Sequence, residues 1–187
     1  ADGYYKIELQ GASGSGGKGA TFSNRASGGG GGGGGGCAIS EVMLKKGDTI
    51  VITCGAVGAD SSVVIYSSME SYASMTVTSG KTAVDCVEYE NWGAYRGEGG
   101  KADGGNVANY NGDSGQQGTH TRNTATARGT GGAGGNPGYA GGNVGGNGES
   151  VYNTSTVGEE DEGVTTPRTY GKPGFVKIYS GDTNKAA

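Results

Sequence analysis

The sequence contains a run of nine consecutive glycines, Gly28–Gly36, and this run constrains the fold more than any other feature. Glycine has no side chain to bury, and ordering nine of them costs on the order of 10–20 kcal/mol of backbone entropy. A lone extended helix made from this run is therefore expected to be disordered. Several such helices, packed side by side, offset the cost because each satisfies the backbone groups of the others.

Glycine also recurs at every third position, within the run and in three other segments. The spaced glycines are Gly11, Gly14 and Gly17; Gly28, Gly31 and Gly34; Gly112, Gly115 and Gly118; and Gly129, Gly132, Gly135, Gly138 and Gly141. A polyproline II helix has three residues per turn, so these glycines lie along one side, where a second backbone can approach closely. The spacing predicts a packed layer of polyglycine-II helices, mainly in residues 11–36 and 97–148.

Collagen, a flexible linker and a wholly disordered chain are also rich in glycine, but each fits this sequence less well than a packed layer. Collagen is excluded because the triplets are too few and the chain has only 3 prolines. A flexible linker accounts for the nine-glycine run but not for the third-position spacing elsewhere. Disorder of the whole chain is disfavoured because the apolar residues are concentrated in 4–9, 39–92 and 174–179.

The apolar segments show the two-residue alternation that is typical of half-buried strands. Tyr5, Ile7 and Leu9 share one face of the first segment, and Thr49–Cys54 is the clearest strand pattern of the chain. The expected strands are 4–9, 39–44, 49–54, 63–66, 74–78, 82–89 and 175–179. Short strands separated by turns, with no helical pattern, predict an all-β antiparallel sandwich, and we expect one domain over residues 1–187.

Three cysteines raise the question of disulfides. Cys54 ends one strand pattern and Cys86 lies within another, so a Cys54–Cys86 bridge between neighbouring strands is expected. Closing that loop of roughly 30 residues would add about 3–4 kcal/mol by loop entropy. Cys37 is then left over, which suggests a bond to a partner chain. The alternative is three reduced, half-buried thiols.

Motifs that resemble chemical sites have no supporting context. Gly14–Gly19 satisfies a dinucleotide-binding pattern, but residues 20–27 and nine glycines follow it instead of a helix. His120 is the single histidine and has no metal-ligand partners near it in sequence. The run Glu159–Glu162 lacks calcium-loop spacing and is typical of a solvated loop. We assign no catalytic, cofactor-binding or metal-binding residue and expect that the chain is not an enzyme.

Charge and hydropathy limit the classes of partner that are expected for this chain. The net charge is −4 and the basic residues are scattered, so nucleic-acid binding is not expected. No apolar stretch approaches the roughly 18 residues of a membrane span, so no membrane insertion is expected. A chain that opens at Ala1 without Met is typical of a processed or excised chain.

Tyrosine dominates the aromatic residues, with 11 tyrosines against 2 phenylalanines. Four of them lie in the polar second half, outside the expected strands: Tyr110, Tyr139, Tyr152 and Tyr170. Tyrosine offers a large amphipathic surface at low entropic cost, so these four are candidate adhesive contacts. The alternative, given equal weight, is that these tyrosines pack over the sandwich and cover it.

Three segments together resemble a family of glycine-rich domains. These are Tyr4–Gly14, in which a Tyr-Lys-Ile-Glu strand enters Gly-Ala-Ser-Gly; Lys45–Ala56, with its Lys-Gly-Asp-Thr turn; and the closing strand Tyr170–Tyr179. Such domains occur at the ends of bacteriophage tail fibres, in surface proteins of gut Firmicutes and in the ectodomain of the anaplastic lymphoma kinase receptor. The resemblance implies a tumour-necrosis-factor-like (jelly-roll) sandwich with polyglycine-II helices, without catalytic residues or a cofactor. The apolar insertion 55–93 and the acidic loop 149–172 depart from the family pattern.

These observations favour an extracellular structural and adhesive role. The leading hypothesis is a phage tail-fibre tip or surface adhesin, with loops 95–125 and 149–172 contacting a cell-surface glycan or protein receptor. The second hypothesis is a bacterial filament subunit that binds copies of itself through Cys37 and edge strands. A signalling ligand or receptor ectodomain is a third class.

Overall fold

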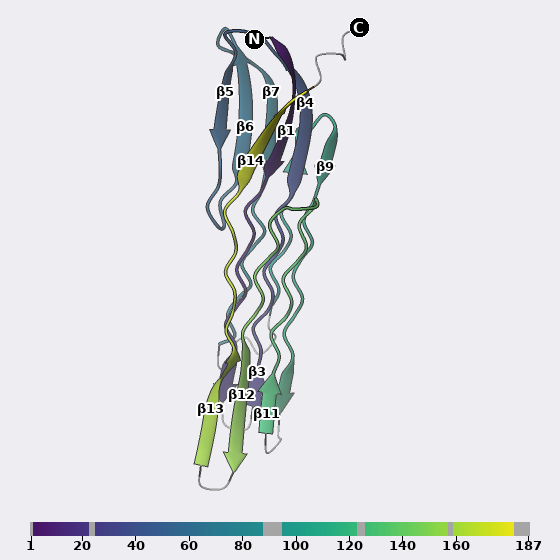
Figure 1. Cartoon of the computed structure of the whole chain (residues 1–187). Helices are drawn as coiled ribbons and strands as arrows, with labels where there is room; N and C mark the ends of the chain where they lie inside the picture. The colour runs from purple at the N-terminus through teal and green to yellow at the C-terminus, as the bar shows by residue number, and fades with distance from the viewer. Residues whose placement is uncertain (1, 23–24, 88–94, 123–125, 157–158, 182–187) are drawn as a thin grey trace.

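The computed structural model describes residues 2–22, 25–87, 95–122, 126–156 and 159–181. These residues form 14 β-strands and contain no helix, so the described chain is all-β. Strands lie at both ends of an elongated molecule, and extended segments without strands run between the ends (Figure 1). The end that holds β1, β4–β9 and β14 is called the sandwich end, and the end that holds β2, β3 and β10–β13 is called the hairpin end.

Two antiparallel four-stranded sheets form the sandwich end. The first has the order β14 (Phe175–Ser180), β1 (Gly3–Gln10), β4 (Cys37–Leu44) and β9 (Ala108–Tyr110). The second has the order β5 (Thr49–Thr53), β6 (Ser61–Ser67), β7 (Glu70–Val77) and β8 (Ala102–Asp103). Strands β1 and β4 contact β6 and β7 across the space between the sheets, an arrangement consistent with the expected β-sandwich.

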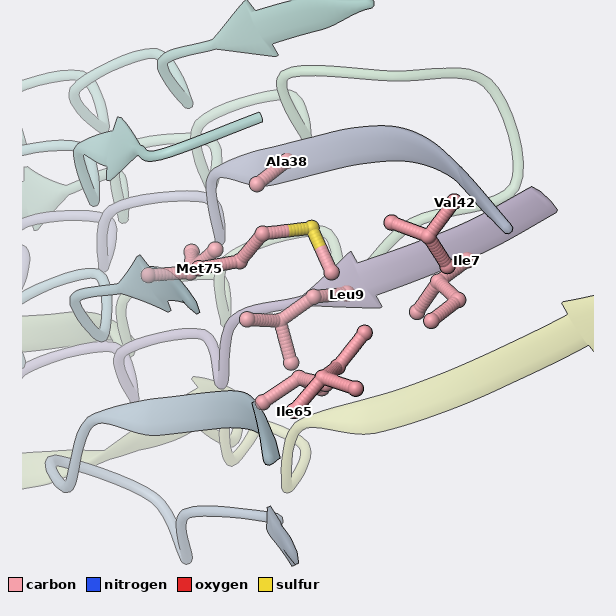
Figure 2. Close-up of a cluster of buried hydrophobic side chains, with 8 residues drawn as sticks. Ile7, Leu9, Ala38, Val42, Ile65 and Met75 are labelled. Carbon is pink, nitrogen blue, oxygen red and sulfur yellow. The ribbon is translucent and has the colours of Figure 1, made fainter. Parts of the chain in front are cut away.

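A compact apolar core fills the space between these two sheets. Strand β1 places Ile7 and Leu9 on its inner face, and both side chains are fully buried. Val63 and Ile65 of β6 face them from the second sheet and are also buried. Figure 2 shows the inward side chains of both sheets in contact around Leu9. The two-residue alternation of the sequence therefore locates this core.

Two antiparallel three-stranded sheets form the hairpin end. One has the order β10 (His120–Arg122), β3 (Arg25–Ser27) and β2 (Ala20–Phe22). The other has the order β11 (Thr126–Gly129), β12 (Ser150–Thr156) and β13 (Glu159–Thr166). Ala26, Ala127 and Val151 form a second, much smaller buried cluster between these sheets.

Eight extended segments connect the two ends, and together they are called the glycine layer. They are 11–19, 28–36, 78–87, 95–101, 111–119, 130–138, 143–149 and 167–174. The chain passes along the layer in alternating directions, away from the sandwich end and back to it (Figure 1). Both ends of the described chain, Asp2 and Gly181, lie at the sandwich end (Figure 1).

Six of the seven expected strands are present with small shifts of their boundaries. The expected strand at 82–89 is wrong, because residues 82–87 belong to the glycine layer; residues 88 and 89 lie outside the described residues. The backbone of this segment bonds to two extended neighbours, through Ala83 to Ser15 and through Val84 to Tyr95, in place of a strand ladder. The strands of the hairpin end lie in polar sequence, where alternation of apolar residues gives no signal.

Candidate functional site: a glycine layer and the hairpin end it supports

The nine-glycine run lies at the centre of the glycine layer, and all nine residues are buried. Its N–H groups reach a given neighbour once in every three residues. Bonds of 2.8–2.9 Å join Gly28 to Thr119, Gly31 to Gln116 and Gly34 to Asp113. Bonds of 2.8–3.0 Å join Gly29 to Glu149, Gly32 to Gly146 and Gly35 to Asn143, and Gly33 donates to Lys81. The run therefore donates to three different segments.

The carbonyl groups of the same run accept hydrogen bonds from the other three surrounding segments. The donors are Gly11, Gly14 and Gly17 from segment 11–19, Gly97 and Gly100 from 95–101, and Gly132, Gly135 and Gly138 from 130–138. The central run is thus bonded to six neighbours in all. A buried backbone needs a partner for each polar group, and here the neighbours supply most of these partners without any strand ladder.

The six neighbours also bond to one another and close a ring around the run. Bonds between successive ring segments include Gly80 N to Ala12 O, Lys81 N to Glu98 O, Gly115 N to Gly97 O, Gln116 N to Ala133 O, Gly148 N to Gly132 O and Gly146 N to Gly14 O. Segment 167–174 lies outside the ring, bonded through Lys172 and Thr169 to segments 11–19 and 143–149. Every described segment of the layer is therefore tied to at least two others.

This arrangement explains why the run has glycine at every position while neighbours such as 11–19, 111–119 and 130–138 have it at every third. A Cβ added to Gly31, Gly33 or Gly35 would overlap a backbone carbonyl of a different neighbour in each case. In the ring, the third-position glycines Gly112, Gly115 and Gly118 point at carbonyls of the run. An uninterrupted run among spaced repeats is therefore the sequence signal for the central position, a signal that the third-position spacing alone misses.

Gly141 does not belong to the packed layer, so its assignment as a helix glycine is wrong. It has a left-handed φ of 78°, and a Cβ placed on it would meet no atom within 4 Å. The chain reverses here at the sandwich end, and Gly142 N donates to Tyr139 O to close the turn. After this reversal, Gly145 and Gly148 face the run from a new segment, one position out of step with the spacing that ends at Gly141.

Three described returns of the chain gather at the hairpin end. Strands β2 and β3 pair directly, with Thr21 opposite Ala26. Strands β12 and β13 form the longest hairpin, with Thr154 opposite Asp161 in its ladder. Strands β10 and β11 are joined by the Thr121 side chain, which accepts from Arg128 N at 2.7 Å and donates to Arg128 O at 2.9 Å. The three returns make contact through β3, β11 and β12.

The two loops expected to contact a target are not loops. Residues 95–101 and 111–119 are segments of the glycine layer, and His120–Arg122 is a strand of the hairpin end. Residues 150–156 and 159–166 form the paired strands β12 and β13, and the acidic run Glu159–Glu162 lies in β13. In the β12–β13 register, residues 153–156 lie opposite the four acidic residues.

The four candidate adhesive tyrosines do not form one surface. Tyr110 and Tyr139 stack near the sandwich end, with ring centroids 5.4 Å apart. Tyr152 is half-buried on β12 beside Gly163. Tyr170, which is 69% exposed, lies in segment 167–174 with the Arg168 guanidinium 5.2 Å from its ring centroid. Packing between neighbouring segments accounts for three of these side chains.

All three cysteines are free thiols, and the expected Cys54–Cys86 bridge is not formed. Cys54 is exposed just after β5 at the sandwich end, whereas Cys86 is buried at the far end of segment 78–87. The Cys86 thiol lies 3.5 Å from Ser27 Oγ and donates to Gly28 O at 3.4 Å, and burial raises its pKa. The length of the glycine layer therefore separates the two sulfur atoms.

Cys37 is fully buried, so the expected bond from Cys37 to a partner chain is also wrong. It begins β4 directly after the glycine run and pairs with Gln10 and Tyr110 of the adjacent strands. Burial raises the pKa of its thiol to about 11. The exposed cysteine is Cys54.

The glycines of the dinucleotide-like motif belong to the glycine layer, whereas His120 lies at the hairpin end. Gly14 and Gly17 of the dinucleotide-like motif donate their N–H groups to Gly33 and Gly30. His120 is exposed at the start of β10. No cluster of three potential metal ligands occurs among the residues that the structure describes. In the same residues, no helix is long and apolar enough to cross a membrane.

No protein-family model matches the chain, and no curated protein matches it significantly.

Proposed function

We propose that this chain is a non-enzymatic extracellular adhesion module, most like a phage tail-fibre tip or a surface adhesin, that binds a cell-surface glycan or protein receptor. In this proposal the glycine layer is a bundle of polyglycine-II helices, and the sandwich end is a TNF-like jelly roll. The three-residue hydrogen-bond repeat supports the first assignment. The resemblance of Tyr4–Gly14, Lys45–Ala56 and Tyr170–Tyr179 to glycine-rich fibre domains supports the second.

One observation carries the proposal: the three returns through β2–β3, β10–β11 and β12–β13 gather at the end of the molecule that is remote from both Asp2 and Gly181 (Figure 1). Anything attached through either of these residues leaves the hairpin end free to approach another surface. Binding residues are commonly placed on loops and hairpins that a rigid scaffold positions. The hairpin end is therefore the receptor-binding end.

The glycine layer suits the role of a rigid spacer. Its central run is fully buried and bonded to neighbours in all lateral directions, and the surrounding segments are bonded to one another. Bending such a bundle would break backbone hydrogen bonds in several segments together, and each buried group left unsatisfied costs about 1–3 kcal/mol. A stiff spacer holds the hairpins at a fixed distance from the sandwich end.

Binding to intact cells tests this function. Fluorescently labelled chain is added to a panel of bacterial and animal cells, each untreated, oxidised with periodate to destroy glycans, or treated with protease. We expect saturable binding to a subset of cells and its loss after one of the two treatments. The absence of saturable binding to every cell type would overturn the adhesion proposal.

A pair of variants tests which end of the molecule binds the receptor. Replacing residues 155–160 by Asn-Gly joins Thr154 to Asp161, which already lie opposite each other, through a favourable two-residue turn. We expect this shortened hairpin to reduce binding at least tenfold with the glycine layer intact. Met69→Lys is the matched control, because Met69 is 94% exposed in a turn of the sandwich end, and this variant is expected to keep full binding. Loss of binding in the control alone would show that the binding surface lies at the sandwich end.

The second candidate function is a subunit that associates with copies of itself. A specific observation favours it, namely an exposed, uncharged edge strand, β5, at the sandwich end. Negative-stain electron microscopy over a range of protein concentrations separates the two functions. Long regular filaments would support the assembly function, and discrete particles at all concentrations would leave adhesion in place.

A further inference from the structure

Strand β5 is an edge strand without the usual protection against pairing with another chain. It forms one edge of its sheet, and its outer side has no strand partner in the described chain. Val51 and Ile52 are 47% and 43% exposed, and Thr49 and Thr53 are exposed as well. All five residues are Thr, Ile or Val, which favour strands. Such an edge is a template for a further strand.

The other edge strands of the described sheets are protected. Strand β14 carries Lys177 near its middle, β11 carries Arg128, and β13 carries the acidic run 159–162. The remaining edge strands, β2, β8, β9 and β10, have two or three residues each. Charge and short length are the common means by which edges avoid pairing. Among the described edges of four residues or more, β5 alone has no charge.

The sequence of β5 is a palindrome, Thr-Ile-Val-Ile-Thr. When such a strand pairs in antiparallel fashion with an identical strand about Val51, Thr49 lies opposite Thr53 and Ile50 lies opposite Ile52. A twofold-symmetric interface requires this self-complementarity, because each contact occurs twice with the roles exchanged. The palindrome therefore points to a second copy of this chain, rather than an unrelated peptide, as the partner of the edge.

The core-side face of β5 also fits a second copy of this chain. Ile50 and Ile52 lie opposite Ile65 and Val63 of β6, both of which are buried in the core. They are therefore on the core side of the sheet, yet Ile52 remains 43% exposed because the core is open at this edge. In the antiparallel pair Ile52 meets Ile50 of the second copy, and the open side of one core is covered by the other.

The flanking residues do not oppose this pairing. The register that centres on Val51 places Asp48 opposite Cys54 and the basic pair Lys45-Lys46 opposite Val57 and Ala56, so no like charges meet. Strand β5 runs roughly along the long axis of the molecule (Figure 1). Antiparallel pairing reverses that direction, so the two glycine layers extend away from each other without collision.

We propose that β5 joins two copies of this chain into a closed, twofold-symmetric dimer, with a sheet that continues across Val51 and with hairpin ends at opposite extremities. This dimer does not depend on the adhesive function, because it uses the sandwich end alone. This dimer and the filament considered above are alternative uses of the same edge, because an isologous contact is satisfied by two copies and leaves β5 unavailable to a third. A short edge of five residues gives a small interface, so the dimer is expected to dissociate on dilution.

Molecular mass against concentration is the first test. Light scattering or sedimentation equilibrium is expected to show a rise from 18.4 kDa to twice that mass as concentration increases, with a longer maximum dimension in solution scattering. Val51→Lys brings two ammonium groups together at the twofold axis and is expected to weaken association at least tenfold. Val164→Lys, at a 53% exposed valine on edge strand β13, is the matched control. A chain that stays monomeric throughout, or a control that dissociates equally, overturns the proposal.

Disulfide trapping tests the register in the Cys54→Ser background. Val51→Cys places two thiols directly opposite each other, whereas Thr53→Cys faces Thr49 of the second copy, which separates the two thiols by roughly four residues or about 13 Å. Mild oxidation is therefore expected to crosslink the position-51 variant much faster than the position-53 variant. Equal crosslinking of both variants, or crosslinking of neither while both remain folded, would exclude this pairing. Binding to cells is measured separately, so either proposal can fail alone.

Discussion

The sandwich end and the glycine layer bury polar backbone by opposite means. In the sandwich, strand ladders satisfy the backbone, and side chains such as Leu9 and Ile65 fill the space between two sheets. In the glycine layer no side chain lies on the central run, and neighbouring backbones surround it on all sides. Buried side chains stabilise the sandwich end, whereas the absence of side chains on the central run allows the close backbone packing that stabilises the glycine layer.

This difference predicts opposite responses to mutation. Removing carbon atoms harms the sandwich because a cavity remains, whereas adding a single carbon harms the glycine layer because two backbones must move apart. Close packing of interiors makes both changes expensive. The layer also depends on the sandwich, because strand β1 continues without interruption into segment 11–19 and strand β4 follows the glycine run directly.

The largest effect is expected from one methyl group at the centre of the layer. A Cβ on Gly33 would overlap the carbonyl oxygen of Glu98, so Gly33→Ala is expected to lower the free energy of unfolding by about 4 kcal/mol or more. Denaturant unfolding followed by circular dichroism measures this change.

The control for this substitution is Gly141→Asn in the turn. That site has a left-handed φ and open space, and Asn tolerates both, so the change should stay within about 1 kcal/mol. If Gly33→Ala were as mild as the control, the layer would be looser than the hydrogen bonds indicate.

The second effect is a cavity in the sandwich. Leu9 is fully buried among Ala38, Ile65 and Met75, so Leu9→Ala is expected to cost about 3 kcal/mol. Because the strands and layer segments are continuous, one transition should report the loss of both regions. Hydrogen exchange of the central glycine amides, measured by NMR, checks this: their protection should fall together with that of β1. Unchanged glycine protection in the variant would show that the two regions unfold separately.

The regular parts of the structure could be predicted from the sequence because their signals are local. Alternation in Tyr5, Ile7 and Leu9 located β1 and its inner face, and the third-position glycines fall in four of the eight segments of the glycine layer. Both signals depend only on which way successive residues point. They need no knowledge of the partner segment.

The predictions that were wrong concern residues whose partners are far away in the sequence. Cys54 ends one apolar pattern and Cys86 lies within another, which predicted a bridge between them. The segment before Cys86 is instead held by backbone bonds to residues 12–18 and 95–101, and these bonds place Cys86 at the hairpin end. The β12–β13 hairpin forms in polar sequence because its ladder is continued by β11. Closure of the ring around the glycine run likewise involves segments that are distant along the chain. Pairing of this kind leaves no local pattern.

A third, smaller effect concerns the boundary between the two regions, where Cys37 follows the glycine run. Burial raises the pKa of this thiol to about 11, so the folded state favours the neutral form. The stability that results is fully present below the pKa of the unfolded thiol, near 8.5, and is lost as pH rises through the folded pKa. The expected loss between pH 8.5 and 11 is about 2 kcal/mol relative to Cys37→Ala.

Denaturant titrations of the wild type and Cys37→Ala at several alkaline pH values measure this difference. Tyrosine and lysine titrate in both proteins, so only the divergence of the two curves reports Cys37. Parallel curves would mean that water reaches the thiol at the junction and that the layer does not seal the base of β4.

The smallest effect is expected from the turn between β6 and β7, where side chains are present in a conformation that suits glycine. Ser68 and Met69 have φ values of 48° and 76° and join Ser67 to its ladder partner Glu70. A two-residue turn with both φ values positive favours Asn-Gly, and left-handed φ costs an ordinary residue about 1–2 kcal/mol. Replacing the pair by Asn-Gly should therefore stabilise the chain by about 1 kcal/mol and raise its Tm.

Met69→Ala is the control for this turn, since it removes the exposed side chain but keeps the Cβ, and its Tm should stay close to that of the wild type. A stabilised Asn-Gly variant beside an unchanged Ala variant would show that backbone conformation, not the exposed methionine, limits the turn. Adding glycine would then stabilise the sandwich end at the one described turn with two positive φ values in succession, while adding a methyl group at Gly33 destabilises the layer. If Met69→Ala gave the whole gain, the strain argument would fail and the contrast between the regions would rest on packing alone.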